Sequence, residues 1–388
     1  MSCTSRPAWK ARRSKRPVPR LAQVVRRFGP AYLKRRGGRV PAHQRKALHA
    51  IESCRTRRLG GIRRACQHCG HAHVRWHSCR NRHCPRCQQG KQQEWIAARL
   101  RELPPVPYAH LVFTVPGALA EHCRAQPEAL YRALFEAASQ SVRRLAKERY
   151  GIKPGMIAVL HTWGQNLHFH PHIHLIVTAG GMTSQGTWKP TPEGYFLPVR
   201  ALSAIFRAKC FAALERQGQS LPEKKLPKEW VVHARAPQAE PGSILLYLAR
   251  YVYRVALDQS RIQSIDNDCV TFRYKDYADR ARTKSMTLNG QEFLRRFLQH
   301  ILPTGFVKVR HYGLFAHATK AKALATLRTS LKQQGTKIAH ATRAILALLA
   351  KTTMPAPPLQ CPRCRSQNLI ATEVMPTPEP LGHWAGAP

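Results

Sequence analysis

Residues 156–178 read MIAVLHTWGQNLHFHPHIHLIVT, two apolar runs separated by a polar loop that is rich in histidine. The runs 156–163 and 172–178 have the length and the branched side chains of buried strands, and the short loop between them predicts a hairpin. The expected fold is multidomain α/β, with helices flanking a central, mainly antiparallel sheet. Similar patterns predict strands at 108–115, 231–236, 270–274 and 284–288, and helices at 126–149 and 291–300.

Histidines recur at every second position of this stretch, at 168, 170, 172 and 174. Because a strand alternates its faces, His172 and His174 point to one side while Ile173 points into the core. Two imidazoles on a rigid strand can hold a divalent ion that polarises a phosphate oxygen. The alternative is an edge strand with half-exposed polar histidines.

A metal site of this kind needs a third ligand, and the sequence leaves three candidates open. If the two runs pair as a hairpin, His161 falls roughly across from His174. Gln165 and His170 lie close by in the loop. Residue spacing alone does not choose among them.

Two pairs of cysteines flank a stretch of 14 residues: Cys66-x2-Cys69 and Cys84-x2-Cys87. Zinc prefers four thiolate or imidazole ligands in a tetrahedron, and each tight Cys-x-x-Cys turn supplies two of them. These four cysteines are therefore expected to bind one structural zinc ion.

Other cysteines leave room for a second zinc site. Cys54, Cys79 and His83 lie close enough to supply ligands, or they are spare thiols and small buried residues. Cys361-x2-Cys364 is half a site, which either recruits ligands from elsewhere in the chain or stays idle.

The chain carries 64 Lys and Arg against 20 Asp and Glu, a formal net charge of +44 over 388 residues. Such a charge calls for a polyanionic partner, and nucleic acid fits because each neutralised phosphate releases counterions. Arg80, Arg82 and Arg86 interleave with the zinc ligands and are expected to contact a phosphate backbone.

Location follows from what the sequence lacks. No apolar run approaches the roughly 20 residues that span a bilayer, and residues 1–23 have no apolar core typical of a secretory signal. Close Cys-x-x-Cys pairs in a large basic chain favour intracellular metal binding over disulfides. We expect a cytoplasmic, nucleoid-associated protein with no membrane partner.

A helix is expected after Ser243, in the stretch ILLYLARYVYRVAL. Tyr247 and Tyr251 are four residues apart and share one helix face. Arg250 and Arg254 each follow a tyrosine by three residues, close enough to hold a phosphate beside its phenol. The alternative is a helix that buries its aromatic rings for packing.

Changes in composition divide the chain into four parts. The expected order is a basic disordered tail (1–20), a helical and zinc-binding, DNA-binding domain (21–102), a catalytic domain (103–320) and a helical, Pro-rich C-terminal tail (321–388).

Together these motifs resemble the two-tyrosine, rolling-circle transposases of insertion-sequence family ninety-one, which belong to the HUH (His-hydrophobe-His) superfamily. The matching stretches are CRTRRLGG, CGH, SCRNRHCPRCQ, VFTVP, FHPHIHLIVTAGG, WVVHARAP, YLARYVYRVA and RHYGLFA, in this order. They fall between about residues 21 and 320, so the resemblance covers most of the chain.

The resemblance implies a DNA strand transferase, a single-strand endonuclease that nicks and rejoins DNA at element ends. Tyr247 and Tyr251 would be the nucleophiles, His172 and His174 the metal ligands, and the product a 5′-phosphotyrosine with a free 3′-hydroxyl. The resemblance also implies Mg²⁺ or Mn²⁺ for catalysis, beside structural zinc. The chain lacks a Gly-x4-Gly-Lys-Ser/Thr loop, so strand separation would fall to host replication or helicase proteins.

Two other functions remain alternatives. An HUH replication initiator or relaxase performs the same chemistry for another purpose. A non-enzymatic zinc-ribbon protein would bind nucleic acid with structural histidines and tyrosines.

Overall fold

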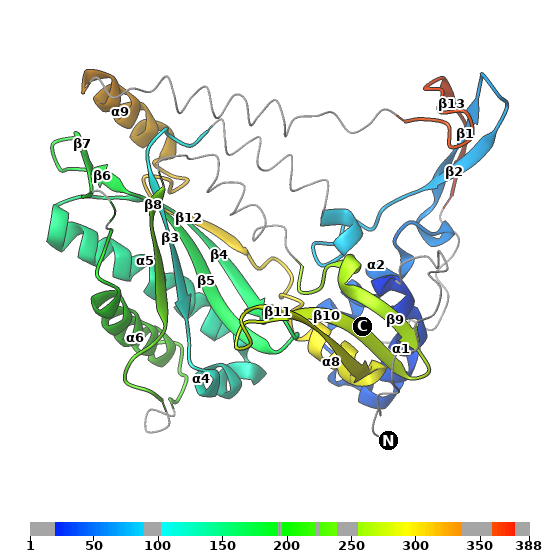
Figure 1. Cartoon of the computed structure of the whole chain (residues 1–388), viewed down its shortest axis with the longest axis horizontal. Helices are drawn as coiled ribbons and strands as arrows, with labels where there is room; N and C mark the ends of the chain where they lie inside the picture. Colours follow the sequence, from blue (N-terminus) through cyan, green and yellow to red (C-terminus); the bar gives the residue numbers. More distant parts are fainter. Residues whose placement is uncertain are drawn as a thin grey trace.

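The computed structural model describes residues 20–88, 102–192, 194, 196–221, 226–238, 255–334 and 359–376 (Figure 1). Its helices are α1 (Leu21–Arg36), α2 (Ala42–Ser53), α4 (Gly117–His122), α5 (Pro127–Tyr150), α6 (Val199–Glu215), α8 (Gly290–Leu298) and α9 (Lys320–Gln333). Its strands are β1 (Gly61–Cys66), β2 (Ala72–Trp76), β3 (Tyr108–Thr114), β4 (Gly155–Trp163), β5 (Phe169–Thr178), β6 (Gly180–Met182), β7 (Trp188–Pro190), β8 (Val232–Gln238), β9 (Ile262–Asp266), β10 (Cys269–Asp276), β11 (Arg282–Asn289), β12 (Val309–Gly313) and β13 (Leu369–Met375). The expected α/β class and a mainly antiparallel central sheet are confirmed.

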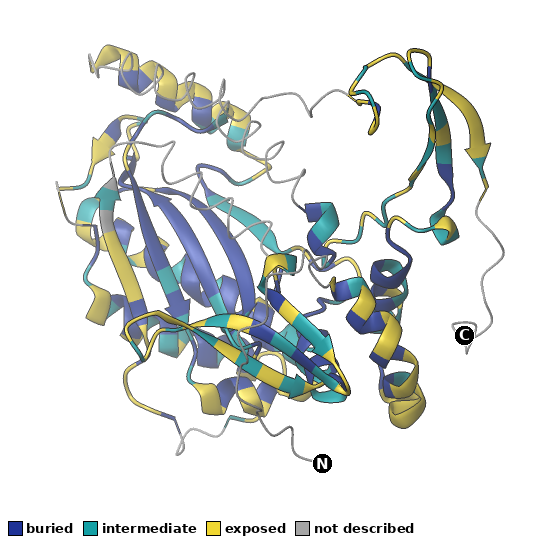
Figure 2. Cartoon of the chain, turned by 45° about the vertical axis from the view of Figure 1, so that its right-hand side comes forward, coloured by how far each residue is buried: buried dark blue, intermediate teal, exposed yellow. Residues whose placement is uncertain are grey.

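The central sheet has the order β12-β4-β5-β3-β8, and every neighbouring pair is antiparallel. Because side chains alternate along a strand, Ile173, Leu175 and Val177 of β5 all enter one core, which α5 and α6 cover. The opposite face carries His172, His174 and Ile176. Near Ile176 this second face is covered by α9 and by the small β6–β7 sheet. Figure 2 shows the sheet as the most deeply buried part of the molecule.

A second body joins the two helices of the N-terminal region to a later part of the chain. Helices α1 and α2 pack with α8 and with the sheet β11-β10-β9 around one hydrophobic core. This core draws on residues 21–54 and on residues 256–301. The domain boundary expected between residues 102 and 103 therefore does not coincide with a boundary between cores. The apolar faces of α1 and α2 are buried against α8 and its sheet, which come from a later part of the chain.

The three-stranded sheet β13-β1-β2 forms a ribbon that stands apart from these bodies in Figures 1 and 2. Its strand β13 comes from the segment that the sequence predicted to be a helical tail. Within that segment only α9 is helical among the described residues, and 369–375 pair antiparallel with β1. The pairing of β1 with β13 shifts register between Arg63 and Arg64. The ribbon thus combines segments far apart in the sequence.

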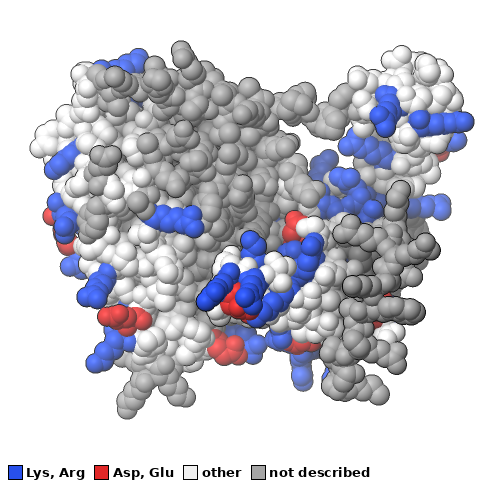
Figure 3. All heavy atoms as spheres, in the orientation of Figure 1, with Lys and Arg blue, Asp and Glu red and all other residues white. Residues whose placement is uncertain are grey.

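Basic side chains lie on all three bodies. In Figure 3, Lys and Arg atoms gather at and below the ribbon and over the β10–β11 hairpin, where Lys284 pairs with Asp276 and Asp279. Among the described helices, none is long and apolar enough to cross a membrane.

Candidate functional site

A cavity of about 530 Å³ opens on the histidine-bearing face of the central sheet. Strands β4 and β5 supply His161, His172 and His174 to its wall, and the β10–β11 hairpin supplies residues 274–277 opposite. The α9 side of this face is filled with apolar side chains. The imidazoles therefore line the cavity at the end of this face that α9 does not cover.

Three of these imidazoles converge. His161, His172 and His174 each offer a ring nitrogen, and these atoms all lie within 4.8 Å of one another. His161 and His174 are buried and His172 is half-buried. The hairpin expected between 156–163 and 172–178 is present, but His161 pairs with His172, and Val159 pairs with His174. The expected pairing was two residues off because the loop is shorter than assumed once β5 begins at Phe169.

Hydrogen bonds fix how two of the rings are turned. His172 donates from Nδ1 to the carbonyl oxygen of His170 at 2.7 Å, so its lone pair lies on Nε2. His174 Nδ1 lies 3.0 Å from His110 Nε2, and the two rings stack with 7° between their planes. When His174 donates in that contact, its Nε2 can bind a metal. A second partner of this kind orients a ligand and raises its basicity.

His110 is a site residue that the sequence analysis missed. It lies on β3, where Val112 pairs with His174, and its side chain shares the face that carries the three imidazoles. Burial, followed by the nearby charge of Arg235, lowers the pKa of His110 to about 4. A neutral ring at position 110 can then exchange a single hydrogen bond with His174. The sequence predicted that His110 lies in a strand, YAHLVFT, but it did not predict that this strand pairs with β5 and so brings His110 beside His174.

The other candidates for a third ligand surround this group without joining it. The ring of His170 lines the cavity and packs between two other imidazoles. Its centroid lies 5.3 Å from that of His168 and 5.1 Å from that of His172. Gln165 also lines the cavity, and its carbonyl oxygen accepts a hydrogen bond from Arg261. Of the three candidates for a third ligand, His161 is therefore the one that lies with His172 and His174.

The tyrosine helix lies outside the described residues. Tyr247, Tyr251, Arg250 and Arg254 belong to the interval between β8, which ends at Gln238, and residue 255, where the description resumes. Their roles remain predictions from the sequence.

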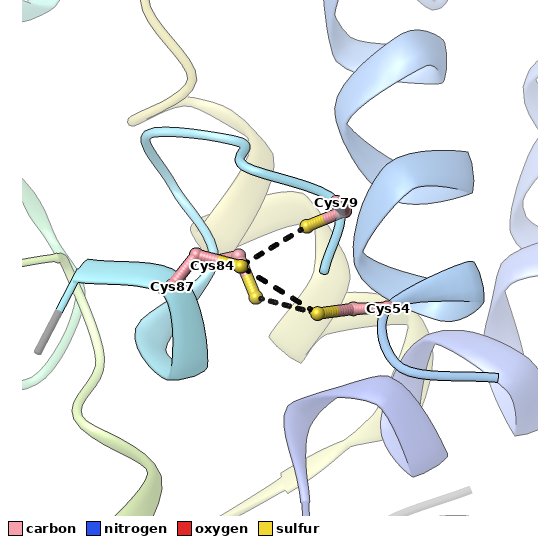
Figure 4. Close-up of side chains that lie close together, drawn as sticks. All are labelled: Cys54, Cys79, Cys84 and Cys87. Atoms are coloured by element: carbon pink, nitrogen blue, oxygen red, sulfur yellow. Dashed lines mark hydrogen bonds between the residues drawn. The ribbon is translucent and has the colours of Figure 1, made fainter. Parts of the chain in front are cut away.

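Four cysteine sulfurs point toward one another beside α2 (Figure 4). They belong to Cys54, Cys79, Cys84 and Cys87, and three of the Sγ–Sγ distances are 3.6, 3.6 and 3.7 Å. With zinc–sulfur bonds of about 2.3 Å, a tetrahedral site has sulfurs about 3.8 Å apart. The four thiols therefore fit one zinc ion, which Cys54, Cys79, Cys84 and Cys87 would hold.

This arrangement corrects the expected grouping of Cys66, Cys69, Cys84 and Cys87 in one site. Cys66 and Cys69 lie instead near Cys361 and Cys364. The physical reason is that β1 and β2 carry Cys66 and Cys69 out along the ribbon, away from Cys84 at the core of the helical body.

The residues between the zinc ligands also divide in role. Arg82 donates hydrogen bonds to the backbone carbonyls of Leu302, Pro303 and Phe306, at 3.2, 2.6 and 2.6 Å. It therefore fastens two chain segments, while the residue itself is exposed and its expected DNA contact remains a prediction. His83 lies outside the four-sulfur group, and its Nε2 accepts a hydrogen bond from the amide of Leu302. Arg80 is exposed.

A basic groove of about 450 Å³ lies where the ribbon meets the helical body. Its wall contains Arg55, Arg64, Arg75 and Arg86 together with the half-buried ring of Trp76. Burial, followed by the charges of Arg20 and Arg55, lowers the pKa of Arg86. Crowded guanidinium groups beside an indole suit a strand that offers phosphates and bases together.

Two protein families match successive parts of the chain. Residues 24–115 match the family described as "Transposase zinc-binding domain", and residues 155–323 match the one described as "Putative transposase". The chain is 40% identical over 339 residues to "Putative transposase y4qJ" of Sinorhizobium fredii, which covers 81% of this chain and 85% of that protein. It is 28% identical over 346 residues to the "Transposase for insertion sequence element IS801" of Pseudomonas savastanoi pv. phaseolicola, covering 83% and 82%. No solved structure matches the chain.

Proposed function

The chain belongs to the insertion-sequence transposase family, and from this premise we propose that it nicks and rejoins single-stranded DNA in rolling-circle transposition. The observation that carries the proposal is the group of His161, His172 and His174 in an open cavity. Three converging imidazoles on a rigid sheet are suited to a divalent ion at a phosphate. The net charge of +44 and the arginine groove support DNA as the substrate.

The chemistry would be a phosphodiester exchange with a tyrosine. The oxygen of Tyr247 or Tyr251 attacks phosphorus, an oxygen–phosphorus bond to the enzyme forms, and the bond to the 3′ oxygen breaks. The phenol proton ends on the departing 3′-hydroxyl, and the 5′-phosphate stays on the tyrosine. One ester replaces another, so no nucleotide cofactor is needed.

The histidines would serve this step by holding Mg²⁺ or Mn²⁺. A bound ion would offset the negative charge that develops on the phosphate oxygens. Magnesium prefers oxygen ligands, so an all-imidazole set favours manganese among these two ions. The chain itself contributes orientation, because His110 and the carbonyl of His170 hold two of the three rings in place.

The test uses labelled single-stranded DNA from the flanks of the element, with each ion in turn. His161→Ala, His172→Ala and His174→Ala should each lose most nicking while they bind DNA nearly as wild type does, because tens of Lys and Arg remain. His122→Ala is the matched control, since this histidine is exposed and bonded to the carbonyl of Ser220.

Nicking that survives in the His172→Ala/His174→Ala double variant would overturn the metal site. DNA binding without any nicking in the wild-type protein would favour the non-enzymatic alternative. Cleavage at plasmid origins in preference to element ends would favour a replication initiator or relaxase.

A further inference from the structure

The second cluster of cysteines lies on the ribbon, apart from the site in the helical body. Cys66 Sγ is 3.5 Å from Cys364 Sγ, and Cys69 Sγ is 3.6 Å from Cys361 Sγ. All four sulfurs lie within 4.8 Å of one another. These distances approach the roughly 3.8 Å edge of a zinc–sulfur tetrahedron and far exceed the roughly 2.05 Å of a disulfide.

The two Cys-x-x-Cys turns have the same backbone design. In one, the amide of Gly70 donates to the carbonyl of Cys66, and the amide of Cys66 donates to the carbonyl of His71. In the other, Arg365 donates to Cys361, and Cys361 donates to Ser366.

The residue after each second cysteine adopts a left-handed conformation, with φ of 68° at Gly70 and 60° at Arg365. An arginine in this conformation is uncommon, and it shows that the second turn adopts this shape without the glycine of the first. A hydrogen bond from the amide of Gln67 to the carbonyl of Asn368 joins the two turns. The pair forms a symmetric frame around the four sulfurs.

The ribbon has little else to hold it together. Val374 of β13 is 74% exposed and Ile370 is 46% exposed. On β1 only the end residues Gly61 and Cys66 are buried, and no residue of β2 is. Sheets this small need a cross-link because they cannot bury a sufficient apolar core.

We propose that Cys66, Cys69, Cys361 and Cys364 bind a second structural zinc ion, which joins segments separated by nearly 300 residues. The site has four cysteine ligands, like the one formed by Cys54, Cys79, Cys84 and Cys87, but it lies on the ribbon. Because β1 and β2 carry Arg64 and Arg75 of the basic groove, the second ion also sets the shape of the DNA-facing surface.

The first test is the zinc content of the purified full-length protein, measured by mass spectrometry of the metal against protein concentration. Wild type should hold two zinc ions per chain, and Cys361→Ser/Cys364→Ser should hold one. Cys123→Ala is the matched control, because this buried thiol lies in the central core outside both clusters, and it should keep two. One zinc in wild type, or two in the double serine variant, would overturn the proposal.

A second measurement needs no variant and so does not depend on folding of the mutant. Cys69 and Cys364 are partly exposed, so burial alone does not shield them from an alkylating reagent. In the native protein both should resist alkylation until a zinc chelator is added, and then both should react together. Alkylation of Cys364 at full rate before the chelator is added would contradict a bound ion. Neither test depends on DNA cleavage, so the result is separate from the proposed function.

Discussion

The contact between His110 and His174 would let one residue influence the proposed metal site without entering it. His110 Nε2 lies 3.0 Å from His174 Nδ1, and stacking holds the two rings nearly parallel. Loss of this contact would let the ring of His174 turn and would make its Nε2 less basic. We therefore propose that His110 is a positioning residue for this site.

His110→Leu should weaken manganese affinity about 10–100-fold, the usual effect of losing such a partner. His110→Gln, which can still exchange a hydrogen bond with His174, should recover part of the loss. Manganese binding followed by electron paramagnetic resonance gives the affinity, and DNA binding should stay unchanged. Wild-type manganese affinity in His110→Leu would show that His110 merely fills space.

Arg82 provides a second prediction at this scale, because its position among zinc ligands and its contacts point to different roles. Its guanidinium bonds three backbone carbonyls between 302 and 306. Arg82→Gln should therefore lower the free energy of unfolding by about 1–3 kcal/mol, because charged hydrogen bonds are lost. DNA affinity should fall no more than in Arg80→Gln, a nearby exposed arginine. Denaturant unfolding and DNA titration measure the two effects, and unchanged stability with reduced DNA affinity would favour the phosphate-contact interpretation.

At the scale of elements, sequence periodicity predicted strands and helices well but not their partners. The runs at 156–163 and 172–178 became β4 and β5 because alternation and branched side chains are local signals. The pairing of His161 with His172 depended on where β5 begins, and a shift of two residues preserves the face, so the pattern could not detect it. Cys-x-x-Cys spacing likewise identified ligand pairs, whereas the partner of each pair depends on tertiary structure.

The packing of α1 on α8 is the contact that joins the N-terminal helices to residues 256–301. A Cβ added at Gly290 would lie 2.4 Å from the ring of Phe28, which is itself buried. Gly290→Ala should therefore destabilise the protein by about 1–3 kcal/mol, the usual cost of overpacking.

Gly117→Ala is the matched control, since no atom lies within 4 Å of the added Cβ and the position is also helical. Its free energy of unfolding should stay near that of wild type or rise slightly. Thermal and denaturant unfolding compare the two variants. Equal stability of both would mean that α1 does not pack on α8 in solution.

At the scale of the whole molecule, the net charge predicts DNA binding but does not say where the strand lies. The groove lined by Arg55, Arg64, Arg75 and Arg86 gives that charge a location. Arg64→Gln/Arg75→Gln should weaken binding to single-stranded DNA and should reduce the dependence of log affinity on log salt by about 1.4, since each of the two lost single-strand phosphate contacts contributes about 0.7.

The control removes the same charge elsewhere. Arg124→Gln/Arg144→Gln neutralises two exposed arginines of the central domain that pair with Glu121 and Glu148. Binding titrations at several salt concentrations should show a smaller change in slope for this variant. An equal change in slope for the two double variants would mean that DNA does not bind preferentially in the groove.

The central claim, a metal-dependent transfer of DNA to tyrosine, is tested most directly by isolating the covalent product. Single-stranded DNA from the flanks is incubated with the protein and manganese, and the protein-linked DNA is digested and sequenced by mass spectrometry. We expect a 5′-phosphate on Tyr247 or Tyr251, lost in Tyr247→Phe/Tyr251→Phe and in His172→Ala/His174→Ala while DNA binding persists. An adduct of undiminished yield in the double tyrosine variant, or its absence from wild-type protein that binds the same DNA, would contradict the account.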